Sequence, residues 1–402
     1  MASPCSPLVC RWCLVPTSSE TVRKRAIRFV ACENALRIDV RLRHVVSGMP
    51  LQRFARQYAS RRELTTNTSR GLPRSPPLPA AGQTLLFWAF PHQYLEYCRR
   101  HYGSCFTVKP TGKEPMVFVS TPRDVQAILA ATGDVLHSGR GGSVLSPIIG
   151  KRPLMLLDET EHLTKRRSIM PSFRRSAVEG YTQMISEVVR QDVASWPLDR
   201  PFAAYPRLRS LTLTVILRVV FGDQSPLMER LHACLLKMLN VTASLTLQEP
   251  WLRRTPPWRS IWRAFLCDRE NVDQLVNIAI QQNSKSDDEI LASLRHVQNP
   301  DGSKLTRLQV RDEIVSLIVA GHETTASQLA WGLQLLAHHP EVQQRLHADI
   351  TDGGDSYLAA TLQEIQRHRS PLMFLPPRVL ISPFKLRGIH CSPPLSSSPV
   401  PI

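Results

Sequence analysis

The sequence predicts a mainly α-helical fold with a small β portion. Apolar residues recur at helical spacing from Glu159 to Ser195 and from Tyr205 to Phe221, and that period places them on one face of a helix. The longest such pattern runs from about Arg307 to His338, and at about 1.5 Å per residue it predicts a rod of roughly 48 Å. Because this helix is both long and rich in apolar residues, we expect it to lie at the centre of the fold.

Local signals support the individual elements. Thr306 and Gln309 have the spacing of a capping box at the start of the long helix. Pro340 marks its end, because the residue before a proline avoids helical geometry. The other predicted elements are, in chain order, a helix at Pro91–His101, strands at Cys105–Lys109 and Met116–Ser120, a helix that starts at Thr121-Pro122, and a loop at Pro250–Arg263.

The composition excludes several classes of protein. Of the 402 residues, 43% are hydrophobic and 21% are charged, which rules out a disordered or collagen-like chain. No apolar run approaches the roughly 18 residues that a membrane helix needs. The net charge of +17 is concentrated in residues 1–70, which carry 13 Lys/Arg against 4 Asp/Glu, or +9, and leave +8 for the remainder. Without a basic stripe interleaved with aromatic residues, or a Cys/His finger, this charge does not indicate nucleic-acid binding.

The chain is expected to divide into three parts. Residues 1–70 form a basic extension that we expect to be disordered, residues 71–393 form the folded domain, and residues 394–402 form a Ser/Pro tail without a core-forming pattern. The extension is open to two interpretations: an upstream stretch wrongly joined to the protein, or an Arg-rich mitochondrial transit peptide. Nine scattered cysteines suit reduced thiols inside a cell. We therefore expect a cytoplasmic location, or a mitochondrial one if residues 1–70 are a transit peptide.

The middle of the long helix carries the hexapeptide Ala320-Gly321-His322-Glu323-Thr324-Thr325. Glycine inside a helix costs about 1 kcal/mol relative to alanine, adjacent threonines are poor helix formers, and a buried glutamate is costly unless paired. Such locally unfavourable choices together are typical of a functional site. Small residues would let a flat cofactor approach the backbone, and the Thr324 hydroxyl can bond the carbonyl one turn back and loosen the helix. The alternative is a kinked helix with a solvated glutamate.

This hexapeptide resembles the oxygen-activating helix of the cytochrome P450 family, the haem-thiolate monooxygenases. Glu364 and Arg367 follow at the spacing of the family's Glu-x-x-Arg pair, which is an internal brace beneath the haem-binding loop. The resemblance covers about Leu72 to Pro393, with the motifs in the family's order. It implies the cytochrome P450 fold, incomplete at the C-terminus.

Two further motifs resemble the residues that hold the haem propionates. His162 and Arg166 are spaced i, i+4, so both cations point to one place on a helix. Arg378 ends the segment Phe374-Leu375-Pro376-Pro377-Arg378, which resembles the family's entry into a strand. Charge-assisted hydrogen bonds to a carboxylate are strong. For His162 and Arg166 by themselves, the alternative is a solvated basic face.

The resemblance implies a monooxygenase that inserts one oxygen atom of dioxygen into a small, apolar organic substrate. Its cofactor would be haem b, and its electrons would come from NAD(P)H through a redox partner such as a ferredoxin. Thr324 would stabilise the activated oxygen and Glu323 would deliver protons, while Ala320 and Gly321 would make room for oxygen and haem. We expect a monomer with no membrane span.

The resemblance fails at the residue that binds the iron. The family's Phe-x-x-Gly-x-x-x-Cys loop supplies a thiolate ligand, but this chain has no match. Cys391 is the only cysteine after Arg367, and Phe384 and Gly388 precede it at the wrong spacing. The segment Phe384–Pro393 instead resembles the strand hairpin before that loop. We therefore expect no metal ligand in this chain, a partly exposed core and an impaired enzyme. The alternative is a truncated, non-catalytic polypeptide from a frameshift, a splice variant or a gene-model error.

Overall fold

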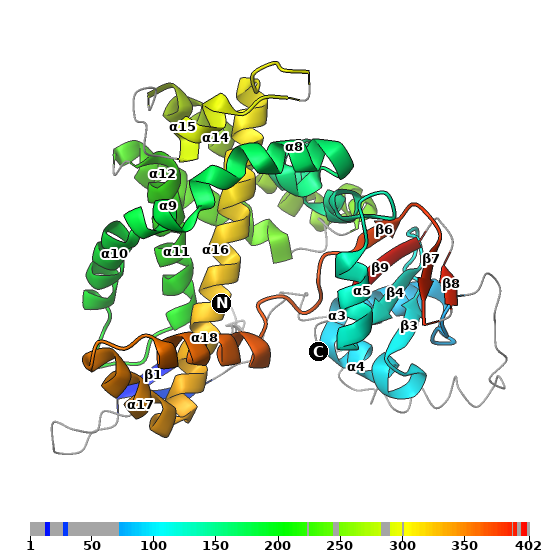
Figure 1. Cartoon of the computed structure of the whole chain (residues 1–402), viewed down its shortest axis with the longest axis horizontal. Helices are drawn as coiled ribbons and strands as arrows, with labels where there is room; N and C mark the ends of the chain where they lie inside the picture. Colours follow the sequence, from blue (N-terminus) through cyan, green and yellow to red (C-terminus); the bar gives the residue numbers. More distant parts are fainter. Residues whose placement is uncertain are drawn as a thin grey trace, which may run out of the picture.

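Helices dominate the computed structural model (Figure 1), which describes residues 13–16, 27–30, 72–222, 225–243, 249–282, 290–299, 301–387, 389–391 and 395–399. The α-helices are α3 Ala80–Ala89, α4 Pro91–Tyr102, α5 Pro122–Ala130, α6 Ser138–Gly141, α7 Ser146–Ile149, α8 Glu159–Ile169, α9 Arg175–Gly180, α10 Thr182–Ala194, α11 Ala204–Phe221, α12 Pro226–Leu239, α14 Trp258–Gln282, α15 Ile290–His296, α16 Arg307–His338, α17 Pro340–Thr351 and α18 Ser356–His368. Short 3₁₀ helices are η1 Gly142–Leu145, η2 Leu154–Leu156, η3 Met170–Phe173, η4 Asn240–Ala243 and η5 Pro250–Arg254. The predicted mainly α-helical class is confirmed.

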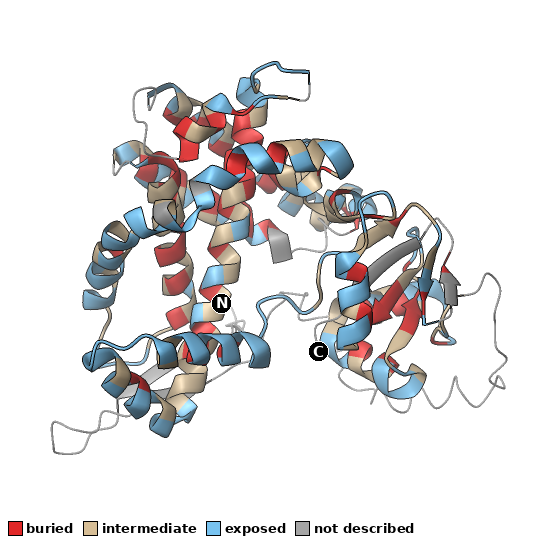
Figure 2. Cartoon of the chain, viewed as in Figure 1, coloured by how far each residue is buried: buried red, intermediate tan, exposed pale blue. Residues whose placement is uncertain are grey.

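Helix α16 has the predicted bounds and lies in the main core. Its start is a capping box, in which the Thr306 amide donates to Gln309 Oε1 at 2.8 Å and the Gln309 amide donates to Thr306 Oγ1 at 3.3 Å. The largest cluster of buried apolar residues draws on α11, α12, α14 and α16 and includes Leu213, Leu217, Leu231, Leu235, Val272, Val276, Ile314, Val315 and Ile318. Figure 2 shows these buried residues along α11, α12 and the upper half of α16, whereas α10 and α18 are largely exposed.

The β portion is a five-stranded sheet in the order β3-β4-β9-β6-β5. The described strands are β1 Cys13–Pro16, β2 Ile27–Val30, β3 Cys105–Val108, β4 Met116–Val119, β5 Leu136–His137, β6 Arg378–Leu380, β7 Phe384–Leu386, β8 Ile389–Cys391 and β9 Leu395–Pro399. Strands β4 and β9 are parallel, and the other neighbours in the sheet are antiparallel. Pairing of His137 with Val379 and of Leu136 with Leu380 fixes β5 against β6, so the sheet determines where Arg378 begins its strand.

Two predicted helical regions differ from the structure. The region from Glu159 to Ser195 is divided into α8, η3, α9 and α10, and Pro171 lies at the break, where it cannot donate a helical hydrogen bond. The predicted loop at Pro250–Arg263 is wrong: it contains η5 and the start of α14 at Trp258. A proline directly before a helix does not oppose it, and Phe265 then packs at helical spacing into the core.

The two ends of the chain also require a correction. The sequence pattern predicts no element in residues 394–402, yet Leu395–Pro399 forms β9 between β4 and β6. Main-chain hydrogen bonds hold such a strand, and they do not depend on apolar side chains. The predicted hairpin is present as antiparallel β7 and β8. Within residues 1–70, β1 and β2 pair antiparallel, and the rest of the expected disordered extension lies outside the described residues. None of the described helices combines the length and apolarity needed to cross a membrane.

Candidate functional site

The hexapeptide of α16 presents two different faces. Ala320 is exposed and Gly321 and Thr324 are half-buried, whereas His322 and Ala326 are buried on the other side. The Thr324 hydroxyl donates to the Ala320 carbonyl at 2.7 Å, which is the predicted bond one turn back. The helix nevertheless remains continuous across the motif. Ala320 and Thr324 therefore share one small-residue face of α16, whereas Gly321 adjoins α11, where an added Cβ would lie 3.3 Å from the Ile216 side chain.

Glu323 is paired with residues of α11, which the sequence did not indicate. Tyr205 donates its hydroxyl to Glu323 Oε1, and Arg209 Nε donates to Glu323 Oε2 at 2.9 Å. The other side of the Arg209 guanidinium donates to Asn240 Oδ1 at 3.2 Å. The glutamate is therefore paired although its side chain remains 40% exposed: α11 orients its carboxylate, and the Thr324 hydroxyl has a different partner.

His322 is fully buried between the same two helices. Its Nδ1 lies 3.2 Å from the Thr212 hydroxyl, which also contacts the His322 carbonyl at 3.1 Å. Its Nε2 lies 3.6 Å from Glu323 Oε2 and has no hydrogen-bond partner among the described residues. Burial lowers the pKa of His322 to about 4, so the imidazole is neutral at physiological pH.

The contact between Tyr205 and Glu323 predicts a measurable titration. Burial, together with the nearby Glu323 charge, raises the pKa of Tyr205 to about 12. Glu323→Gln removes the charge, so the Tyr205 pKa should fall while staying above its ordinary value, because burial remains. Tyrosinate absorbance during an alkaline titration, with Tyr205→Phe to assign the signal, measures this shift. The control Glu364→Gln removes an exposed carboxylate and should leave that pKa unchanged; an unchanged pKa in Glu323→Gln would contradict the contact.

His162 and Arg166 lie on α8 close enough to influence each other. Burial and the Arg166 charge lower the pKa of the half-buried His162, and Asp158 opposes them. Arg166 is exposed and has no hydrogen-bond or ion-pair partner among the residues that the structure describes. Its guanidinium donors are therefore available to an anion.

Arg378 approaches the same place from β6. Burial lowers its pKa, and Asp158 opposes that effect, so one carboxylate acts on both Arg378 and His162. Asp158 is the residue before α8. Asp158 thus acts on both His162 of α8 and Arg378 of β6, although the elements that carry them are far apart in the chain. Because the pKa of His162 is lowered, its imidazole is mainly neutral at neutral pH. That His162, Arg166 and Arg378 hold haem propionates remains a prediction.

Glu364 and Arg367 form the predicted pair on α18. The Arg367 guanidinium donates twice to the Glu364 carboxylate, at 2.7 Å and 2.6 Å. The side chains are 62% and 70% exposed, so among the described residues the pair lies on the surface and not inside the fold. The hydrogen bonds lower the pKa of Glu364 and raise that of Arg367. A role as an internal brace remains a prediction.

The described cysteines do not fit an iron site. Cys391 is buried in the core beside β6 and α5, and burial raises its pKa. Cys98 is fully buried, and burial raises its pKa to about 12. No group of three or more His, Cys, Asp or Glu side chains in the described ranges could hold a metal ion. Burial therefore keeps Cys391 and Cys98 as protonated thiols at neutral pH, and the haem contacts of His162, Arg166 and Arg378 stay a prediction.

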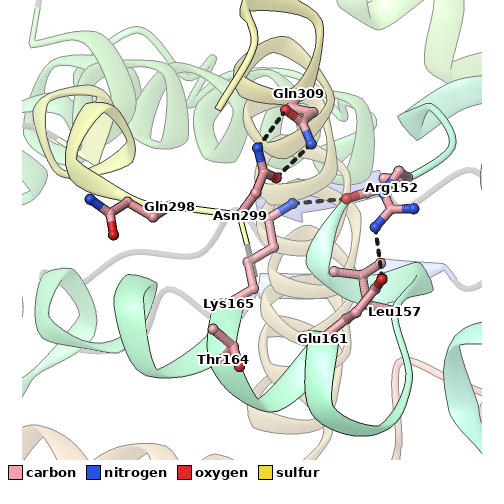
Figure 3. Close-up of a pocket in the computed structure, with 8 residues that line it drawn as sticks. All are labelled: Arg152, Leu157, Glu161, Thr164, Lys165, Gln298, Asn299 and Gln309. Carbon is pink, nitrogen blue, oxygen red and sulfur yellow. Dashed lines mark hydrogen bonds and ion pairs between the residues drawn. The ribbon is translucent and has the colours of Figure 1, made fainter. Parts of the chain in front are cut away.

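A polar surface pocket of about 290 Å³ lies next to α8 but is separate from the site (Figure 3). It is lined by Arg152, Leu157, Glu161, Thr164, Lys165, Gln298, Asn299 and Gln309. Lys165 Nζ donates to the Arg152 carbonyl at 2.8 Å and forms an ion pair with buried Glu313 of α16. The predicted site residues do not line this pocket. The ion pair of Lys165 with Glu313 beside it joins α8 to α16.

Sequence reasoning missed the residues that support the site. Tyr205, Arg209 and Thr212 are spaced i, i+4 and i+7, which puts these three polar side chains on one face of the helix 205–221. That spacing was a usable signal for a polar partner. Lys165, between the two predicted clamp residues of α8, carried no signal that distinguished it from a solvated lysine.

Comparison with known proteins decides the family. The family model for cytochrome P450 matches residues 73–392. The chain belongs to the cytochrome P450 family. The putative cytochrome P450 135B1 of Mycobacterium tuberculosis is 32% identical over 339 residues, covering 81% of this chain and 71% of that protein. The putative cytochrome P450 135A1 of the same species is 31% identical over 315 residues, covering 76% and 69%.

The fold agrees with this assignment. The solved structure described as retinoic acid bound cyanobacterial CYP120A1 matches with a TM-score of 0.71 and 20% identity, covering 82% of this chain and 76% of that one. The cytochrome P450 family consists of haem-dependent monooxygenases, which work with an electron-transfer partner and an organic substrate. The likeness to this structure shows that the chain has the same overall fold.

Proposed function

We propose that this cytochrome P450 binds haem b and inserts one oxygen atom of dioxygen into a small, apolar organic substrate. The observation that supports the proposal is that one carboxylate, Asp158, acts on both His162 of α8 and Arg378 of β6, and that Arg166 lies one helical turn after His162. Two propionates need cationic donors at one place, and arginine binds carboxylates through two parallel hydrogen bonds. The exposed Ala320 would supply the small surface against which the flat ring would lie, and Gly321 beside it lets α16 pack closely on Ile216 of α11.

Bound haem would supply the oxygen chemistry, and the chain's own residues would control position and protons. Thr324 holds its hydroxyl proton on the Ala320 carbonyl and can turn it outward to donate a hydrogen bond. Glu323 would supply protons from its carboxyl group. Tyr205 and Arg209 orient that group from α11, and because its side chain is 40% exposed, the carboxylate can take up a proton from solvent and pass it on.

We further propose that electrons come from NAD(P)H through a ferredoxin or a similar partner. Support comes from charge: outside residues 1–70 the chain still carries a net +8, and a basic surface attracts an acidic redox protein. The substrate would be selected by residues 137–156 and 241–262. We expect the protein to act as a monomer in the cytoplasm.

We also propose that this chain by itself is impaired in oxygen activation, because its described cysteines supply no iron ligand. The full chain is expressed with haem supplied, then reduced and exposed to carbon monoxide. Haem uptake without the red-shifted Soret band of a thiolate complex is expected. A thiolate-type band would contradict the impairment, and no uptake at all would favour a non-catalytic polypeptide.

The proposed role of Arg166 in haem binding can be tested with two matched variants of neighbouring arginines on α8. Arg166→Gln should weaken haem binding roughly tenfold, because it removes a charge-assisted donor to a propionate. Arg167→Gln removes a neighbouring exposed arginine and should bind haem like the unmodified chain. Haem titration followed by Soret absorbance measures both. Equal haem affinities for the two variants would contradict the proposed contact between Arg166 and a haem propionate.

A further inference from the structure

Asp158 does not cap the helix that it precedes. Its carboxylate makes no cap hydrogen bond to α8 and instead accepts from the Gly139 amide at 2.7 Å and from the Arg140 amide at 2.9 Å. Each oxygen of the carboxylate is thus held by a main-chain donor of α6. Since main-chain groups cannot swing away, the charge is fixed in place.

Helix α6, to which Asp158 is hydrogen-bonded, packs closely against the start of β6. A Cβ atom at Gly141 would lie 1.6 Å from the Pro377 carbonyl oxygen and 3.3 Å from the Arg378 amide. A Cβ atom at Gly139 would lie 2.6 Å from the backbone of Leu156. Helix α6 is therefore in close backbone contact on both sides, and it connects Asp158 mechanically to the residue before Arg378.

The same carboxylate acts on side chains of other elements. It opposes the lowering of the pKa of His162 on α8 and of Arg378 on β6. His137 Nδ1 of β5 lies 3.7 Å from Asp158 Oδ2. Because two amides already bond the carboxylate, it acts on His162 and Arg378 through its charge while it holds α6.

We propose that Asp158 is a positioning residue of the haem-propionate clamp: by bonding α6 and directly preceding α8, it fixes the start of β6, which carries Arg378, relative to the helix that carries His162 and Arg166. The inference rests on the proposed haem binding. It adds a residue that does not touch the cofactor and that acts through the elements carrying the three cations. The negative charge of Asp158 would repel a haem propionate bound nearby. Its position is therefore explained by a structural role and not by direct binding of the haem.

The test compares Asp158→Asn with Asp134→Asn in the full chain. The amide side chain of Asp158→Asn keeps an acceptor for one main-chain donor but loses the charge, whereas Asp134 is an exposed carboxylate before β5 that undergoes the same charge change. In the haem-free protein, NMR titration of His162, assigned with His162→Gln, should show a lower pKa in Asp158→Asn only. Hydrogen exchange at residues 138–141 should also become faster in that variant.

Haem titration then separates this proposal from the proposed function. Asp158→Asn should lose roughly tenfold or more in haem affinity, the usual effect of removing a residue that orients a cofactor ligand, while Asp134→Asn should be unchanged. Equal affinities, or an unchanged His162 pKa and unchanged exchange, would overturn the role of Asp158. If the unmodified chain takes up no haem, the proposed function fails, and the two haem-free measurements alone decide whether Asp158 positions the cations.

A second variant keeps the proposal testable if the first one does not fold. If circular dichroism shows that Asp158→Asn is unfolded, Asp158→Ser replaces it, since serine is a good acceptor for main-chain amides before a helix. The same losses are expected. Unchanged haem affinity in a folded Asp158→Ser would overturn the proposal.

Discussion

Replacing Lys165 with methionine is expected to lower the free energy of unfolding by about 3–5 kcal/mol at neutral pH. The Lys165 side chain is 8% exposed and that of Glu313 is 1% exposed, so water cannot take over the role of the lysine. The Glu313 carboxylate would keep only the Leu154 amide as a donor, at 2.9 Å. An uncompensated buried charge would then lie between α8 and α16. Chemical denaturation measures the loss.

The pH dependence gives this prediction a second readout. Burial raises the pKa of Glu313, although Lys165 opposes the rise. A carboxyl group with a raised pKa in the folded state contributes stability below its unfolded pKa and loses it as the pH rises through the folded pKa. Without Lys165 the rise is larger, so the deficit of Lys165→Met should shrink as the pH is lowered from about 8 to about 5.

Two variants control for the loss of a lysine. Lys237→Met removes an exposed lysine of α12 and should change stability by less than about 0.5 kcal/mol. Adding Glu313→Gln to Lys165→Met removes the unpaired charge and should restore part of the stability. A deficit that is independent of pH, or is not reduced by Glu313→Gln, would mean that lost packing and not the buried charge is responsible.

Gly141→Ala is expected to destabilise the protein by about 3 kcal/mol or more, at the upper end of the cost of overpacking. The added Cβ would meet the Pro377 carbonyl oxygen at 1.6 Å and the Pro377 carbonyl carbon at 2.5 Å. Both are backbone atoms, so no side chain can rotate away. Gly141 has an ordinary helical φ of −63°, and the whole effect is therefore steric. Thermal or denaturant unfolding measures it.

Gly82→Ala is the matched control for a glycine in a helix. At Gly82, within α3, an added Cβ would meet only the Pro79 side chain, at 4.0 Å. This change should stabilise the protein by about 0.5–1 kcal/mol, because alanine loses less conformational freedom than glycine on folding. If both variants were equally stable, α6 would not be in close contact with the start of β6.

The predictions that succeeded depend on residues close together in the chain. The bounds of α16 follow from the Thr306–Gln309 capping box and from Pro340. The bond from Thr324 to Ala320 and the pair of Glu364 with Arg367 join residues one helical turn apart. Such features require only that a helix forms, and the periodicity of the sequence predicts the helix.

The predictions that failed depend on contacts across the fold. Proline and tryptophan residues favoured a loop at Pro250–Arg263, but packing of α14 into the core outweighed that preference. The Ser/Pro composition of the tail disfavoured a strand, but β4 and β6 offer main-chain partners on both sides of β9. The partners of Glu323 come from α11, a helix more than 100 residues earlier in the chain.

The sequence by itself determined the helical class, the position of the central helix and the family. Only the tertiary structure decided that Glu323 is paired with Tyr205 and Arg209, that Lys165 is buried against Glu313, and that Asp158 acts on both His162 and Arg378. The physical reason is that the residue type alone does not show whether a charged side chain is surrounded by water or by a buried partner. Its environment is set by which distant elements pack against it, and local periodicity carries no information about that choice.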